Sequence, residues 1–158
     1  MKVLGLDIAT CTGYSVVEGK KVTNKGIILL NSKLPYKPRF KQFRKELVKL
    51  LREHKPDAVV LEGVYSGRNV STSAYLNNLR GIAIEVIPLY SEFLSAQVKK
   101  VRSEVMGNGN STKEDVFQWV CKKYKIKDLQ IKRDKDKDIT DSILLATWGL
   151  LKLTSEAD

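Results

Sequence analysis

Four acidic residues in this sequence have the types and the spacing expected of a metal site. Asp7 and Glu62 each end a short apolar run, and Asp138 and Asp141 lie three positions apart. A carboxylate at the end of a buried strand must be paired, protonated or bound to a metal, because desolvating a lone charge is costly. Carboxylate oxygens suit Mg²⁺ or Mn²⁺. One or two such ions could activate a water for phosphoryl displacement, a chemistry that requires no histidine or cysteine nucleophile.

The elements that must position Asp7 and Glu62 can be read from the surrounding pattern. The apolar runs at residues 3–6 and 58–61 are typical of strands buried on both faces. Between them, residues 39–54 have apolar side chains at helical spacing, which predicts an amphipathic helix. A strand, helix and strand in this order favour a right-handed crossover between parallel strands. Asp7 and Glu62 should then lie at the same edge of the sheet, where sites form in α/β proteins.

The second acidic pair is expected at the start of a helix that opens with Asp138. A separation of three residues places the carboxylates of Asp138 and Asp141 on one helix face, within reach of one ion. An ordinary helix start, with an acid as N-cap and another in the first turn, explains this pair equally well by itself. The combination with two strand-end acids in a basic protein favours a metal-dependent nuclease.

The remaining chain predicts further elements of an α/β domain. Residues 13–18 and 22–30, joined by a Gly19-Lys20 turn, should form an antiparallel meander with the first strand. A capping box is expected at Ser111 to Glu114, at the start of another helix. The other expected elements are a helix at 71–85, a strand at 87–90, a helix at 96–105 and a lysine-rich mobile surface segment from Lys122 to Lys137.

Composition is consistent with one domain spanning residues 1–158 and with a polyanionic partner. The chain has 28 Lys and Arg against 18 Asp and Glu, a net charge of +10. Nucleic acid is the usual partner of such a domain, although membrane binding or simple solubility also fits. The basic face of the 39–54 helix is better explained by solvation than by DNA contact. With no long apolar run and no signal peptide, we expect a cytoplasmic protein without membrane association.

Histidine and cysteine contribute little to the predicted chemistry. The single histidine, His54, falls near the end of the 39–54 helix, where a capping role is expected. Cys11 and Cys121 are far apart and lack metal spacing, so we expect two small buried residues without a disulfide or a zinc site.

Several short motifs, in this order, resemble the RuvC-type Holliday junction resolvases of the ribonuclease H-like fold. They are Gly5-Leu6-Asp7-Ile8 with Thr12-Gly13-Tyr14, Leu61-Glu62-Gly63-Val64-Tyr65, Arg80-Gly81-Ile82-Ala83, Gly107-Asn108-Gly109 with Lys113, and Asp138-Ile139-Thr140-Asp141. In its short length and high lysine content, the chain is more similar to phage-encoded members of this family. The resemblance implies an α/β fold with a mixed five-stranded sheet, three strands antiparallel and two parallel, flanked by helices. It also implies a homodimer that nicks a four-way DNA junction symmetrically with Mg²⁺.

The resemblance also implies roles for individual residues. Asp7, Glu62, Asp138 and Asp141 would be metal ligands. Tyr65 matches an aromatic residue that stacks on bases at the junction centre, although a core or surface tyrosine is the alternative. Lys113 matches a lysine near the scissile phosphate, where the alternative is a solvated first-turn residue. An essential basic residue is expected among Lys99, Lys100 and Arg102, and Arg68 is a further candidate for DNA contact.

Three other functions are compatible with parts of this sequence. A broader ribonuclease H-like nuclease acting on forks, branched DNA or RNA-containing substrates would use the same acids. A non-catalytic DNA-binding module would retain the basic surface but has no need for four acids. A nucleotide-binding half of the actin and sugar-kinase type also begins with Gly-x-Asp, but 158 residues leave no room for the second half. The sequence makes no prediction about a branch-migration partner.

Overall fold

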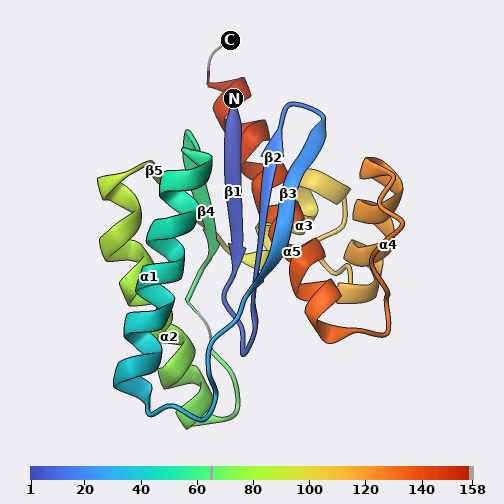
Figure 1. Ribbon diagram of the computed structural model, residues 1–158. Helices are drawn as coiled ribbons and strands as arrows, with labels where there is room; N and C mark the ends of the chain where they lie inside the picture. The colour runs from blue at the N-terminus through green and yellow to red at the C-terminus, as the bar shows by residue number, and fades with distance from the viewer. Residues whose placement is uncertain (65, 157–158) are drawn as a thin grey trace.

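The fold is built on one mixed five-stranded sheet. The computed structural model describes residues 1–64 and 66–156. The strand order is β3-β2-β1-β4-β5, in which β1, β2 and β3 are antiparallel neighbours and β4 and β5 run parallel to β1 (Figure 1). The strands are β1 (Lys2–Asp7), β2 (Thr12–Glu18), β3 (Lys21–Ile28), β4 (Ala58–Glu62) and β5 (Glu92–Ala96). The predicted sheet, with its antiparallel meander and its parallel pair, is confirmed.

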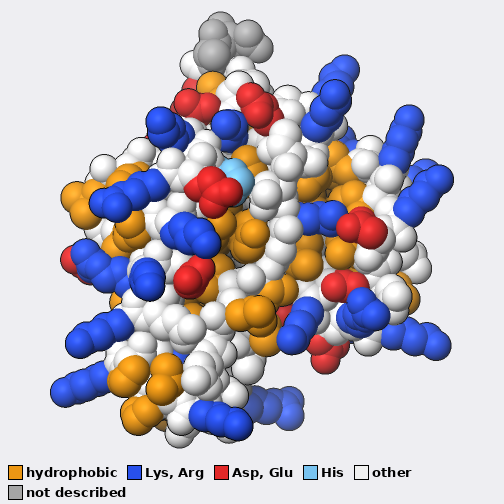
Figure 2. Space-filling model, viewed as in Figure 1, with side chains coloured by type: hydrophobic (Ala, Val, Ile, Leu, Met, Phe, Trp, Pro, Cys, Tyr) orange, Lys and Arg blue, Asp and Glu red, His pale blue; other side chains and the backbone are white. Residues whose placement is uncertain are grey.

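Helices cover both faces of this sheet. They are α1 (Tyr36–His54), α2 (Val70–Val86), α3 (Val98–Met106), α4 (Lys113–Tyr124) and α5 (Asp134–Ser155). One apolar core lies between the sheet and the pair α1 and α2, and a second lies on the other face, where α5 packs with α3 and α4 (Figure 1). Lysine and arginine side chains project around the rim of the face shown in Figure 2. None of the helices within residues 1–64 and 66–156 is long and apolar enough to cross a membrane.

The register of β1 and β4 brings their carboxyl ends to one edge of the sheet. Leu6 pairs with Leu61 in the parallel ladder, so Asp7 and Glu62 are the next residues on neighbouring strands. Asp7 also pairs with Gly13 on β2. The predicted helix between these strands is confirmed as α1, and it buries Phe43, Leu47, Leu50 and Leu51 against the sheet. The crossover therefore aligns the two strand-end acids as expected.

Several local predictions were wrong. Residues 87–89 form a short 3₁₀ helix that continues α2, and the strand lies further on, as β5. Pro88 is compatible with this 3₁₀ turn because a first-turn residue needs no backbone donor. The capping box lies one residue later than predicted: Thr112 accepts from the Asp115 backbone, and the Asp115 carboxylate accepts from the Thr112 backbone.

The lysine-rich segment was also misjudged. Helix α4 extends to Tyr124 and α5 already begins at Asp134, so both ends of the segment predicted to be mobile are helical. Asp138 is therefore not an N-cap. It lies in the second turn of α5, and Asp136 is buried and accepts a hydrogen bond from the Gln130 backbone, which ties the preceding loop to the helix.

Cys11 and Cys121 are free, as expected, but both are only partly buried. His54 is the last residue of α1, where its backbone carbonyl accepts from Lys2. It is followed by Lys55, which is the left-handed C-cap.

Candidate active site

Three of the four predicted acids converge at the edge of the sheet. One carboxylate oxygen from each of Asp7, Asp138 and Asp141 lies within 4.8 Å of the other two. Asp7 comes from the end of β1, and the other two come from one face of α5, as their three-residue spacing predicts. Asp7 and Asp138 are buried, and Asp141 is nearly so. Three carboxylates at this separation repel one another unless a cation lies among them.

Two glycines allow α5 to lie this close to the strands. A Cβ atom on Gly5 would overlap the backbone oxygen of Ser142, and one on Gly13 would overlap the backbone oxygen of Asp138. Any side chain at either position would push α5 away from the sheet. Gly13 also pairs with Asp7 across the ladder, so the same residue borders both acids.

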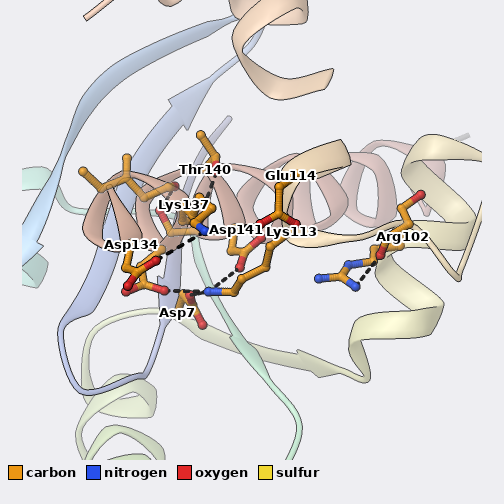
Figure 3. Close-up of polar contacts among 12 residues, drawn as sticks. Asp7, Arg102, Lys113, Glu114, Asp134, Lys137, Thr140 and Asp141 are labelled. Carbon is orange, nitrogen blue, oxygen red and sulfur yellow. Dashed lines mark hydrogen bonds and ion pairs between the residues drawn. The ribbon is translucent and has the colours of Figure 1, made fainter. Parts of the chain in front are cut away.

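Lys113 supplies a cation to this acidic cluster. Its Nζ atom lies 2.7 Å from Oδ1 of Asp138, 3.1 Å from Oδ2 of Asp141 and 3.8 Å from Oδ2 of Asp7. Figure 3 shows the Lys113 side chain reaching from α4 toward Asp7 and Asp141. Lys113 is the first residue of α4, and the capping box of Thr112 and Asp115 fixes that end of the helix.

The surroundings change the proton affinity of these groups. Burial, followed by the charge of Asp141, raises the pKa of Asp7 well above its usual value. Burial also raises the pKa of Asp141, although Lys113 opposes this increase. Burial lowers the pKa of Lys113, but the neighbouring carboxylates outweigh it and the net shift is upward. The lysine is therefore firmly protonated, and the carboxylates depend on its charge.

Glu62 lies beside the cluster rather than within it. It lines the same pocket of about 370 Å³ as Asp7, Asp141 and Lys113, but it is not one of the three acids whose oxygens converge. Burial and the charge of Asp141 raise the pKa of Glu62, while Arg102 and Lys113 lower it. The charges of the cluster therefore affect the pKa of Glu62, which lines the same pocket from the end of β4.

The site fits a divalent metal ion. Oδ2 of Asp7 is buried and has no hydrogen-bond partner among the described residues, an expensive arrangement for a carboxylate oxygen. The available donors are carboxylate oxygens, the hard ligands that Mg²⁺ and Mn²⁺ prefer. Asp7, Asp138 and Asp141 could hold one ion directly, and Glu62 could contribute from the neighbouring strand.

Comparison with known proteins shows the family of this chain. The model of the family described as "Crossover junction endodeoxyribonuclease RuvC" matches residues 3–148. The chain belongs to the RuvC family. A RuvC from Chlorobium phaeovibrioides is 30% identical over 96% of this chain and 82% of its own length. A RuvC from Aliarcobacter butzleri is 31% identical over 92% of this chain and 96% of its own length.

The fold of this RuvC family member is also found in a solved structure. The structure of T. thermophilus RuvC in complex with a Holliday junction substrate aligns with a TM-score of 0.85, covering 99% of this chain and 96% of that one. The two sequences are 18% identical, so this likeness concerns the fold. The ribonuclease H-like architecture expected from the sequence is therefore confirmed.

The basic candidates for DNA contact occupy different positions. Arg102 on α3 lines the pocket and donates a hydrogen bond to the Ser111 backbone, just before the α4 cap. Lys99 and Lys100 are exposed on the same helix and do not line the pocket. Arg68 is exposed in the loop before α2. Tyr65 lies outside the described residues.

Sequence reasoning assigned no role to three residues that support the site. Arg80 on α2 donates to the backbone oxygen of Glu62 and to Oγ of Ser95, so it joins the ends of β4 and β5. Gly5 and Gly13 allow the backbone of α5 to lie close to β1 and β2. A glycine inside a buried strand is a known sign of close backbone approach, and this signal was available in the sequence at Gly5. The position of Arg80 had no such signal, because it depends on where α2 crosses the sheet.

Proposed function

We propose that this RuvC family member is a metal-dependent endonuclease that resolves Holliday junctions by hydrolysing phosphodiester bonds. The observation that carries the proposal is the convergence of Asp7, Asp138 and Asp141 around Lys113 at the edge of the sheet. Family membership supports the reaction, and the net charge of +10 supports a nucleic-acid substrate.

We propose Mg²⁺ as the physiological cofactor, with Mn²⁺ as a substitute, in one or two ions per subunit. Asp7, Glu62, Asp138 and Asp141 would hold these ions. When bound, they would supply an activated water and neutralise charge on the attacking and leaving oxygens. Oδ2 of Asp7, which is buried and accepts no hydrogen bond from the described residues, supports this ligand set.

The protein's own cations would act on the phosphate. Lys113 is protonated, partly exposed and fixed at the start of α4, so its ammonium group can donate to a phosphate oxygen as negative charge develops there. Arg102 offers a second cation from another wall of the pocket. We therefore propose Lys113 as a catalytic residue and Arg102 as a residue that binds and orients DNA.

The wider substrate contacts are proposed on the family resemblance. Tyr65 would stack on bases near the junction centre, and Arg68, Lys99 and Lys100 would contact DNA around the site. Residues 1–158 would form one nuclease domain that acts as a homodimer, so that two sites make symmetric paired nicks. The enzyme would work in the cytoplasm, on the cell's branched DNA.

A cleavage assay tests this proposal. The substrate is an immobile four-way junction, compared with a linear duplex of the same sequence and with fork and RNA–DNA hybrid substrates, in the presence of Mg²⁺. We expect paired symmetric nicks in the junction, and we expect Asp7→Asn to abolish them while retaining junction binding. Equal cleavage of forks and hybrids would indicate a broader nuclease. Junction binding without cleavage would indicate a non-catalytic module and would overturn the proposal.

A further inference from the structure

The outer face of α1 carries a dense row of basic side chains far from the acidic cluster in sequence. Four lysines recur at every fourth position, and two arginines lie beside them. We call this set the α1 stripe: Lys37, Lys41, Arg44, Lys45, Lys49 and Arg52, all exposed. Figure 2 shows Lys and Arg side chains gathered over the part of the surface where α1 lies in Figure 1.

The sequence favoured solvation as the explanation of this basic face, but the charge pattern of α1 is poorly explained by solvation alone. Like charges four residues apart destabilise a helix, and Lys37, Lys41, Lys45 and Lys49 repeat this unfavourable spacing. The first turn of α1 contains no acid, so Lys37 also opposes the helix dipole. A sequence that breaks these local rules without a compensating interaction usually does so for function.

The protein itself provides little countercharge. Arg44 pairs with Glu85 at 2.8 Å, but no other residue of the stripe forms an ion pair with any described residue. Lys41, Arg44, Lys45, Lys49 and Arg52 line one shallow groove on α1, together with Val48 and Glu53. Glu53 makes no ion pair with the stripe among the described residues. The groove is therefore strongly positive and open to a polyanion.

The position of α1 relates the stripe to the active site. Helix α1 begins at the end of the molecule to which the carboxyl ends of β1 and β4 point, and it runs back along the face of the sheet opposite α5 (Figure 1). Its 19 residues span about 28 Å, since each adds about 1.5 Å. This length approaches one turn of B-form DNA, about 34 Å. A duplex leaving the site at the sheet edge could continue along α1.

We propose that the α1 stripe is a second DNA-binding surface, which holds the phosphate backbone of one duplex arm of the junction outside the catalytic pocket. This inference rests on the proposed function, because it requires a branched DNA substrate with arms. The stripe makes no base contacts in this proposal. It adds affinity and orients the arm, as phosphate contacts do in other DNA-binding proteins.

The test uses variants of the full chain in which lysines are replaced by uncharged residues. Lys41, Lys45 and Lys49 are changed together to Gln, which preserves side-chain length and helix propensity. The matched control changes three exposed lysines elsewhere to Gln: Lys20 and Lys21 at the β2–β3 turn, and Lys122 on α4. Both variants have the same net charge. A third variant, which combines Lys41→Arg, Lys45→Arg and Lys49→Arg, keeps the charge of the stripe.

Binding is measured by fluorescence anisotropy over a salt series, with Ca²⁺ replacing Mg²⁺ to prevent turnover. For junctions with arms of about two helical turns, we expect the stripe variant to bind at least about tenfold more weakly than the control. Its plot of log K against log salt should be shallower by about 0.9 for each phosphate that the stripe no longer neutralises. With arms of about half a turn, the stripe and control variants should bind alike, and the Arg variant should bind as the unchanged protein does.

The outcomes separate this inference from the proposed function. If the unchanged protein neither binds nor cleaves junctions, the proposed function fails. If it binds and cleaves them but the stripe and control variants are weakened equally, or the weakening is independent of arm length, the DNA-binding role of the stripe is overturned. Thermal unfolding shows whether the substitutions destabilise the fold. The stripe variant should unfold at the same temperature as the unchanged protein or above it, because the repulsion between lysines along α1 is relieved.

Discussion

The Nζ atom of Lys113 lies 2.7 Å from Oδ1 of Asp138, so a cation from α4 occupies the centre of a cluster of acids carried by β1 and α5. The same ammonium group is 3.1 Å from Asp141 and 3.8 Å from Asp7. Three separate elements of the chain are thus joined through one side chain. In the absence of metal, Lys113 is the countercharge that allows these carboxylates to lie together.

Lys113→Met should affect both catalysis and stability. We expect junction cleavage to fall by about 10²–10³-fold, the usual effect of removing a donor that stabilises developing charge. The metal-free protein should lose about 1–2 kcal/mol of unfolding free energy, less than for a fully buried pair because Lys113 is 43% exposed. Single-turnover cleavage and urea unfolding measure the two effects. Lys137→Met, which removes pairs to Glu114 and Asp134, is the control and should change neither greatly. Unchanged cleavage by Lys113→Met would exclude a catalytic role.

A divalent ion and the Lys113 ammonium should compete for the same oxygens. Ca²⁺ or Mg²⁺ should raise the unfolding temperature of the unchanged protein, because a ligand that binds only the native state stabilises it. Asp7→Asn and Asp138→Asn should largely abolish this increase. Lys113→Met should bind Ca²⁺ at least as tightly as the unchanged protein in isothermal titration calorimetry. Markedly weaker binding would mean that Lys113 assists the ion rather than competing with it.

The raised pKa values of Asp7, Glu62 and Asp141 set the pH dependence of the metal-free protein. All three shifts arise chiefly from burial. The native state therefore retains protons that the unfolded chain releases at lower pH, and its stability falls as pH rises through the native pKa values. We expect the unfolding free energy in EDTA to increase as pH is lowered from about 8 to about 5.

Asp7→Asn isolates the contribution of one carboxyl group to the pH dependence of the unfolding free energy. The variant should be more stable than the unchanged protein at neutral pH, and its pH dependence should be shallower. Urea midpoints across the same range provide the measurement. The lowered pKa values of Glu104, Glu114, Asp115 and Asp128 act in the opposite direction, but only as pH approaches their ordinary values of 3.8 and 4.5. If the unfolding free energy of the unchanged protein instead rose with pH between about 5 and about 8, this result would contradict the raised pKa values of Asp7, Glu62 and Asp141.

The positions of the acids could be predicted because they follow from local pattern and from handedness. Buried strands that end in Asp7 and Glu62 are joined by a helix, and the right-handed crossover rule then places both at one edge. The spacing of Asp138 and Asp141 fixes their shared face on any helix. The distance of α5 from each strand could not be predicted from the sequence. Glu62 lies outside the three-acid group because α5 approaches β1 and β2 more closely than β4.

The ends of helices were harder to predict from the sequence where charged residues replace the apolar periodicity. The run from Asp134 to Asp138 alternates acids and lysines and has no apolar periodicity, yet it forms the first turns of α5, where Lys137 pairs with Asp134 and Glu114. The pair with Glu114 joins segments distant in sequence. The position of Lys113 within the acidic cluster likewise depends on the packing of α4 against α5, which no local signal reports.

The close approach of α5 to the strands gives a last prediction, on the glycines that permit it. Gly5→Ala would drive a methyl group into the Ser142 backbone oxygen, so α5 must move outward. We expect a decrease of about 1–3 kcal/mol or more in unfolding free energy, the range for overpacked cores. Gly13→Ala would press on the backbone of Asp138 itself, so it should weaken Ca²⁺ binding and cleavage more than its decrease in stability explains.

Gly81→Ala is the matched control for these two substitutions. Gly81 is exposed within α2, and a Cβ atom there would meet nothing within 4 Å. Because alanine favours a helix over glycine, this variant should gain about 0.5–1 kcal/mol and cleave junctions normally. Urea unfolding, Ca²⁺ titration and junction cleavage of the three variants separate general stability from site geometry. If Gly13→Ala retained full Ca²⁺ affinity and activity, the approach of α5 at Gly13 would not be what positions Asp138 beside Asp7.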